Sequence, residues 1–200
     1  MSDASKRPRR AAGPPPNATR LREAALAHLA RFAATEVGLR RVLERRIARW
    51  ARAAEAEGQA REAIAATTAA LHVEITSLAQ SLVVAGAIDD AAFAESRARR
   101  LARSGHSRRA IAAHLATKGV ATETAAAALP EGEEAELLSA LAFCRRRRLG
   151  PFARVAPDAA VRMKALAAMA RGGFAQGVAR RALSMDPTEA EEMLLAGRRG

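Results

Sequence analysis

Alanine occupies 54 of the 200 positions, whereas large aromatic side chains are limited to five Phe and one Trp, with no Tyr. Alanine is the best helix former, and its small side chain lets helices pack closely. So few large side chains would not fill the thick core of a β-sandwich. Apolar residues recur from about residue 20 onward at the 3.6-residue spacing of amphipathic helices. The sequence therefore predicts an all-α protein.

Internal similarity predicts that these helices form repeats. Segments 29–43, 101–115 and 169–183 align without gaps, and each places an apolar-Ala-Arg triplet before a short turn and a second helix. A unit of three short helices hides its apolar face poorly, so neighbouring units are expected to stack. We therefore expect three tandem three-helix repeats in an elongated, curved array.

Glycine, proline and helix-capping residues predict where the repeats begin and end. Thr35, Asp89 and Ser107 are expected N-caps, because their side-chain oxygens can accept a hydrogen bond from the first turn. Three consecutive prolines near the N-terminus cannot join a helix interior. The predicted limits are 1–17 for a disordered basic tail, 18–86 for the first repeat with a longer connection at 51–72, 87–130 for the second, 131–186 for the third and 187–200 for a C-terminal tail.

The charge of the chain indicates an acidic partner. The net charge is +12, and 30 of the 33 basic residues are Arg. A GC-rich genome explains the choice of Arg over Lys, but not the surplus of bases over acids. Residues 93–118 and 140–164 each carry seven bases and one acid, whereas residues 119–139 carry five acids and no base. This pattern favours a polyanion or an acidic protein surface as partner over solubility alone.

The candidate binding residues follow from the two basic blocks. Phe93, Ala94, Ala98 and Leu101 account for the inner face of a helix predicted at 90–104, and arginines occupy much of the remainder. The stretch CRRRRLGPF at 144–152 forms a second cluster. Guanidinium groups pair with carboxylates and phosphates alike, so the residue type does not name the partner. The candidates are Arg97, Arg99, Arg100, Arg103, Arg108, Arg109, Lys118, Arg145, Arg146, Arg147 and Arg148.

A catalytic role has little support in the sequence. The four histidines are scattered, and the sequence contains no phosphate-binding loop, dinucleotide fingerprint, nucleophile elbow or HExxH motif. Cys144 has two interpretations: the adjacent arginines would lower its pKa and make it reactive, or it is a small apolar residue on a buried helix face, which we favour. We expect no enzyme activity, no cofactor and no metal.

The expected location is the cytoplasm. The sequence has no signal peptide and no apolar run of about 18 residues that would span a membrane. A single cysteine excludes a disulfide framework and fits a reducing compartment.

The sequence also restricts the modes of nucleic-acid binding that we expect. No helix–turn–helix unit begins its second helix with the Asn or Gln that commonly reads adenine, apart from Gln176. Aromatic platforms for stacking single-stranded bases are scarce. A basic surface suited to phosphate backbone, to an acidic protein groove, or to both remains.

One long motif resembles a known family. The stretch GAIDDAAFAESRARR, followed by SRRAIAAHLATKGV, resembles the central signature of the RecX family of RecA regulators. The C-terminal KALAAMARGGFAQGVARRAL is similar to the last repeat of that family, and residues 21–47 are similar to its first. Ala175 departs from the pattern, because the last repeat usually has a Ser cap there, and Gly177 weakens the helix that follows. The matching central residues are Gly86, Ile88, Asp89, Asp90, Phe93, Ala94, Arg97, Ile111, Leu115, Lys118, Gly119 and Val120.

The resemblance implies the repeat architecture and a function, and we expect the protein to be a monomer. The resemblance implies binding along the groove of the RecA–DNA filament, with inhibition of strand exchange, ATP hydrolysis and co-protease activity. Such a protein acts in DNA repair, homologous recombination and the SOS response. Weak direct binding to single- or double-stranded DNA stays open, as does the alternative of a nonspecific, architectural nucleic-acid-binding protein. A helical scaffold without a nucleic-acid role fits the charge blocks poorly.

Overall fold

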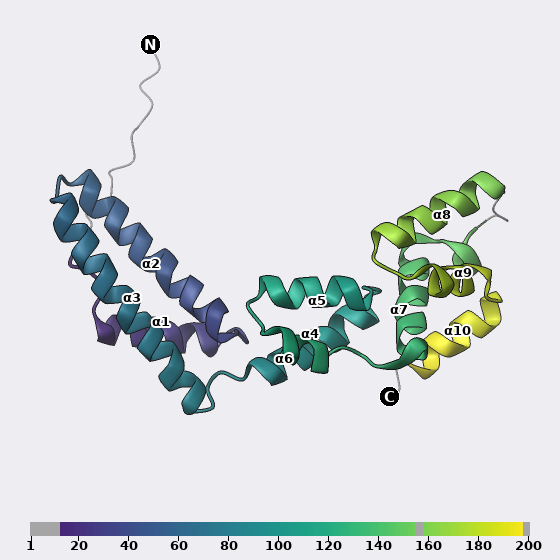
Figure 1. Ribbon diagram of the computed structural model, residues 1–200, viewed down its shortest axis with the longest axis horizontal. Helices are drawn as coiled ribbons and strands as arrows, with labels where there is room; N and C mark the ends of the chain where they lie inside the picture. The colour runs from purple at the N-terminus through teal and green to yellow at the C-terminus, as the bar shows by residue number, and fades with distance from the viewer. Residues whose placement is uncertain (1–12, 155–157, 198–200) are drawn as a thin grey trace, which may run out of the picture. The chain divides into compact units, whose positions relative to one another are not determined.

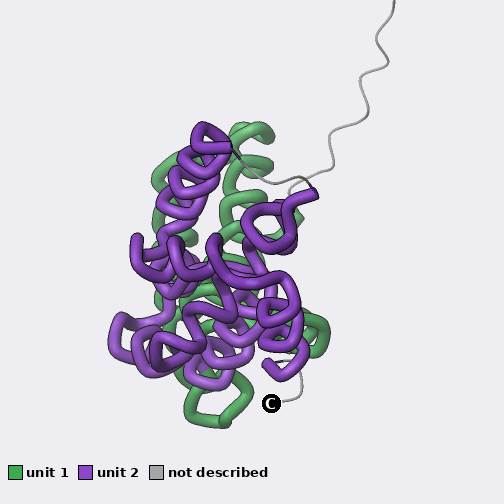
Figure 2. The backbone as a smooth tube through the Cα atoms, turned by 90° about the vertical axis from the view of Figure 1, so that its right-hand side faces the viewer, with its two compact units in different colours: residues 1–89 green, residues 90–200 purple. Residues whose placement is uncertain are grey.

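The computed structural model describes residues 13–154 and 158–197, and every regular element in these ranges is a helix (Figure 1). The predicted all-α class is confirmed. The chain divides into two compact units, residues 1–89 and 90–200 (Figure 2). Among the helices of the described ranges, none combines the length and apolar character that crossing a membrane requires.

The first unit contains three helices, α1 (Ala18–Leu29), α2 (Glu36–Ala56) and α3 (Arg61–Val84). The predicted cap at Thr35 is present, because its Oγ1 accepts a hydrogen bond from the Gly38 amide at 2.9 Å. Helices α2 and α3 lie side by side (Figure 1) and make the most extensive helix contact of the unit. The core consists of Leu21, Ala25, Leu39, Leu43, Ile47, Leu71, Ile75, Leu82 and Ile88.

The longer connection expected at 51–72 is wrong. Helix α2 continues to Ala56 and α3 begins at Arg61, so only a short turn separates them. Ala54 and Leu71, which lie inside the expected connection, are buried in the unit. Because alanine serves on either face of a helix, an alanine-rich segment shows weak periodicity even where it packs.

The N-terminal tail is shorter than expected. Pro16 is buried, and the Trp50 Nε1 donates a hydrogen bond to the Gly13 carbonyl at 3.3 Å. The Asn17 side chain caps α1 by accepting from the Arg20 amide at 2.9 Å. Residues 13–17 therefore pack on the first unit, whereas residues 1–12 of the predicted tail lie outside the described residues.

The second unit begins with the helices of the predicted second repeat, α4 (Asp90–Arg103), α5 (Arg108–Thr117) and α6 (Thr122–Ala127). Ser107 caps α5 as predicted, because its Oγ accepts a hydrogen bond from the Ala110 amide at 3.1 Å. The core of this repeat is small, as expected from the composition. It consists of Ala94, Ala98, Ile111, Leu115, Val120 and Ala125.

The remainder of the second unit is arranged around one central helix, α7 (Gly132–Arg147), whose buried residues lie on several of its faces. The short η1 (Gly150–Phe152), α8 (Ala159–Arg171) and α9 (Gln176–Ser184) follow. As the Ser-to-Ala departure at position 175 implies, α9 has no side-chain cap. The buried cluster includes Leu137, Leu141, Phe143, Cys144, Met169, Phe174, Ala182 and Leu194.

The C-terminal tail expected at 187–200 is wrong for its described part. Residues Pro187–Ala196 form α10, which packs against α7. Asp186 caps α10 by accepting from the Thr188 amide at 2.8 Å. Ala190 and Leu194 are buried. Helix α10 is therefore part of the core around α7 and not a tail that comes after the folded unit. Residues 198–200 lie outside the described residues.

Candidate arginine-rich binding surface

The predicted basic residues of the second unit fall into groups that have different roles in the structure. Arg97 holds α4 on α5, because its Nε donates a hydrogen bond to the His114 Nε2 at 3.0 Å. Burial, and then the charge of Arg97, lower the pKa of His114. A neutral imidazole can accept this hydrogen bond, whereas a protonated one cannot. Arg97 is therefore engaged inside the second repeat.

Arg108 joins the second repeat to the segment that follows it. Its Nη1 donates to the Pro130 carbonyl at 2.6 Å, and its backbone amide donates to the Glu136 carboxylate at 3.0 Å. Burial raises the pKa of Glu136, although the hydrogen bond from the Arg108 amide and the charge of Arg108 act in the opposite direction. These contacts give Arg108 a structural role.

The structure brings together residues from both basic blocks. Arg99 and Arg103 on α4 and Arg145 on α7 line one cavity of about 430 Å³. The apolar residues along it include Ala102, Leu138, Ala142 and Leu194. Blocks that are separated by an acidic stretch in the sequence thus share one surface of the second unit.

Two of the arginines that line this cavity pair with carboxylates but stay accessible to solvent. Arg99 Nη1 lies 3.4 Å from Glu95 Oε2, and the two side chains are 60% and 57% exposed. Arg145 Nη1 lies 4.0 Å from Glu191 Oε2. Exposed pairs of this kind contribute about 0–1 kcal/mol. A partner with several acidic groups can therefore replace Glu95 and Glu191 beside these arginines at a small cost in free energy.

The remaining candidates lie on the surface in other surroundings. Arg100, Arg109 and Lys118 are exposed. The Arg146 and Arg147 guanidinium carbons lie 5.8 and 4.9 Å from the centroid of the Phe143 ring, within the range of cation–π attraction. Arg148 ends α7 in the left-handed conformation, with φ 56° and ψ 50°. It lines a different cavity from Arg145.

Cys144 is a core residue, as the favoured interpretation predicted. Its side chain is fully buried, and its thiol lies 3.8 Å from the Met169 sulfur. Burial raises the pKa of the thiol to about 12. Burial determines the direction of this shift, and the adjacent Arg146, Arg147 and Arg148 are exposed to solvent. In residues 13–154 and 158–197, no group of three or more His, Cys, Asp or Glu side chains is placed to hold a metal ion.

Basic residues outside the candidate set also line a groove. In the first unit, a cavity of about 580 Å³ is lined by Arg40, Arg41, Glu44, Arg45 and Ala48 on α2 and by His72 and Thr76 on α3. The signal for these arginines was their position opposite the buried face of α2. The charge blocks did not reveal them, since Glu36, Glu44 and Glu55 dilute the charge of this helix.

These features define a helical-repeat protein whose exposed arginines suit an acidic partner. Residues 89–129, which include α4 to α6, match the family model described as RecX, second three-helix domain. The chain is 37% identical over 186 residues to the regulatory protein RecX of Myxococcus xanthus (strain DK1622), an alignment that covers 91% of each chain. It is 44% identical over 108 residues to the regulatory protein RecX of Agrobacterium fabrum (strain C58), covering 54% of this chain and 58% of that protein. The chain belongs to the RecX family.

Proposed function

We propose that this protein binds the RecA recombinase and its filament on DNA, and inhibits strand exchange, ATP hydrolysis and co-protease activity. The single observation that carries the proposal is the similarity to a regulatory protein RecX over 91% of both chains. RecA is named as the partner because the central signature resembles that of the RecX family of RecA regulators. In this proposal the protein is a non-enzymatic regulator of DNA repair and the SOS response. It acts as a monomer in the cytoplasm, where RecA works on DNA.

The proposed contact surface is the exposed part of the arginine set. Arg97 and Arg108 are engaged in internal hydrogen bonds, so they position the helices rather than meet the filament. Arg99, Arg103 and Arg145 line one cavity, and Arg100 and Arg109 are exposed. Guanidinium groups in such an array can pair with carboxylates of RecA and with phosphates of the bound DNA. Bridging or blocking neighbouring protomers in this way would hinder filament growth or its conformational cycling.

The test is a triple charge reversal on α4, in which Arg99, Arg100 and Arg103 are replaced by Glu. The variant is expected to keep its helical circular dichroism and to lose inhibition of the DNA-dependent ATPase of RecA. The matched control reverses Arg46, Arg49 and Arg52 on α2, which are also exposed and give the same change in net charge. Full inhibition by the α4 variant would refute the assigned surface.

A second candidate function is nonspecific nucleic-acid binding. The net charge of +12 and the groove lined by Arg40, Arg41 and Arg45 favour it. A protein that contacts several phosphates loses affinity steeply as salt rises, because counterions are released on binding. If the affinity for naked DNA at moderate salt equals the affinity for RecA–DNA filaments, this second function replaces the first.

A further inference from the structure

The last part of the second unit contains a further cavity, which Arg148 and Arg162 of the second basic block help to line. It has a volume of about 280 Å³ and lies between η1, α8 and α9. Its walls are mostly aliphatic, and three arginines but no carboxylate are among the residues that line it. The apolar lining side chains are Leu149, Ala153, Val161, Ala165, Leu166 and Leu183.

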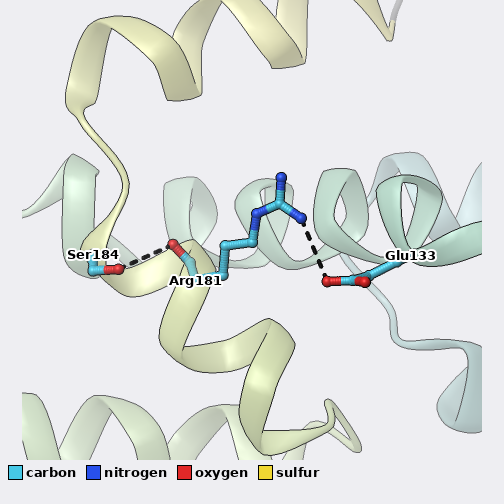
Figure 3. Close-up of polar contacts among 3 residues, drawn as sticks. All are labelled: Glu133, Arg181 and Ser184. Carbon is cyan, nitrogen blue, oxygen red and sulfur yellow. Dashed lines mark hydrogen bonds and ion pairs between the residues drawn. The ribbon is translucent and has the colours of Figure 1, made fainter.

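The two neighbouring arginines of α9 are used differently. Arg181 Nη1 lies 3.4 Å from Glu133 Oε1 at the start of α7, and the Ser184 Oγ donates to the Arg181 carbonyl (Figure 3). Arg180 instead lines the cavity. Among the residues that the structure describes, no carboxylate lies within 4.0 Å of the Arg180 or Arg148 guanidinium. Arg181 therefore ties α9 to α7, whereas Arg180 lies beside the cavity with no carboxylate partner in the described part of the chain.

Arg148 lines the same cavity from an unusual backbone conformation. Its φ of 56° is the one positive value found for a non-glycine residue in residues 13–154 and 158–197. Glycine is the common residue at such a helix end, because it adopts this conformation without strain. Strained conformations concentrate at binding and catalytic sites. The arginine at this position therefore favours a role for its side chain at the cavity.

We propose that this cavity binds a peptide segment of an acidic protein. One aliphatic side chain of the peptide enters between Leu166 and Leu183, and carboxylates on either side of it pair with Arg148 and Arg180. The volume is just below the roughly 300–1,000 Å³ of small-molecule sites, which suits a single anchoring side chain. The inference goes beyond the proposed function, because it names the chemistry of a ligand and does not depend on RecA.

A nucleic-acid base fits the cavity less well than an aliphatic side chain. Proteins that bind single strands stack bases on aromatic rings, and none of the residues that line the cavity is aromatic. Carboxylates next to an apolar residue match both the aliphatic walls and the guanidinium groups of Arg148 and Arg180. An acidic peptide is therefore the occupant that the lining favours over DNA.

The first experiment measures peptide binding by fluorescence anisotropy with the full chain. The probe is a labelled synthetic peptide with two central leucines flanked by glutamates, and the comparison peptide has serines in place of the leucines. The leucine peptide is expected to bind at least about tenfold more tightly, since burial of one leucine is worth roughly that factor. Equal affinity of the two peptides would overturn the apolar anchor.

Variants then locate the site. Arg148→Gly and Arg180→Ala are each expected to weaken binding of the leucine peptide about tenfold, the effect of losing one charge-assisted contact. Glycine suits the left-handed backbone at position 148, and circular dichroism checks that both variants stay folded. The matched control is Arg181→Ala, which removes the contact with Glu133 and is expected to leave peptide affinity unchanged. Two results would refute the proposal. One is wild-type affinity for the leucine peptide in both Arg148→Gly and Arg180→Ala. The other is a single-stranded oligonucleotide that displaces the peptide from the wild-type protein but not from Arg180→Ala.

Discussion

The Ser107 Oγ donates a hydrogen bond to the Gly172 carbonyl at 2.7 Å, across 65 residues of sequence. The same oxygen caps α5 by accepting from the Ala110 amide, and Ser107 is fully buried. One hydroxyl thus begins a helix of the second repeat and binds the end of α8. Gly173 lies so close that a Cβ there would be 2.6 Å from this oxygen. The contact joins the predicted second and third repeats, which belong to the same compact unit.

Ser107→Ala is therefore expected to destabilise the protein by about 1–3 kcal/mol, from a lost cap and a half-buried carbonyl left without its partner. Urea unfolding followed by circular dichroism measures the change. The control is Asp158→Ala, because Asp158 caps α8 from an exposed position through the Val161 amide. The control should cost about 1 kcal/mol. Equal losses in the two variants would show that the contact between Ser107 and Gly172 adds nothing.

Gly105 and Gly86 separate the effect of backbone conformation from that of close packing. Both have a positive φ, 82° and 70°. A Cβ at Gly105 would lie 2.5 Å from the Phe143 amide nitrogen on α7, whereas a Cβ at Gly86 would meet nothing within 4 Å. We expect Gly86→Ala to cost about 1–2 kcal/mol from the left-handed conformation alone. Gly105→Ala should cost about 1–3 kcal/mol more, because α4 and α7 must move apart.

The same unfolding measurement decides between the two glycines. A similar loss of stability in Gly105→Ala and Gly86→Ala would contradict the close approach between the end of α4 and Phe143.

Much of the fold could be predicted where large apolar residues mark one face of a helix. Leu39, Leu43, Ile47 and Trp50 are buried as their spacing indicates. The segment 51–72 was misread because its alanines give no contrast between faces. Helix α10 was missed although Asp186 and Pro187 are a good helix start, since the predicted third repeat already had its three helices.

The candidate site could be predicted as a surface but not residue by residue. Arg97, Arg99 and Arg108 look alike in the sequence, yet Arg97 binds His114 and Arg108 binds Pro130 and Glu136. These partners come from positions 17 to 28 residues away. An arginine's partner depends on which helix packs beside it, and short-range patterns do not contain that information.

Cys144 is expected to resist thiol reagents in the native protein. With a pKa near 12, the thiol is almost wholly protonated at about pH 8, and only the thiolate reacts. A colorimetric disulfide reagent should therefore modify no thiol of the folded chain and one thiol after denaturation. Rapid modification of the folded chain would show that the adjacent arginines do activate the thiol.

The burial of His114 and its contact with Arg97 make the stability of the second unit depend on pH. The pKa of His114 is lowered in the folded state by burial and by Arg97, so the unfolded chain takes up a proton first as pH falls below about 6.5. Stability due to His114 is thus fully present above that pH and declines down to the folded pKa. Glu136, whose pKa is raised, acts in the opposite sense, so only a comparison isolates the histidine. His114→Gln, which keeps an acceptor for Arg97, should lose less stability than the wild type between about pH 7 and 5 in urea unfolding. Identical pH profiles for the two proteins would mean that folding does not lower the pKa of His114.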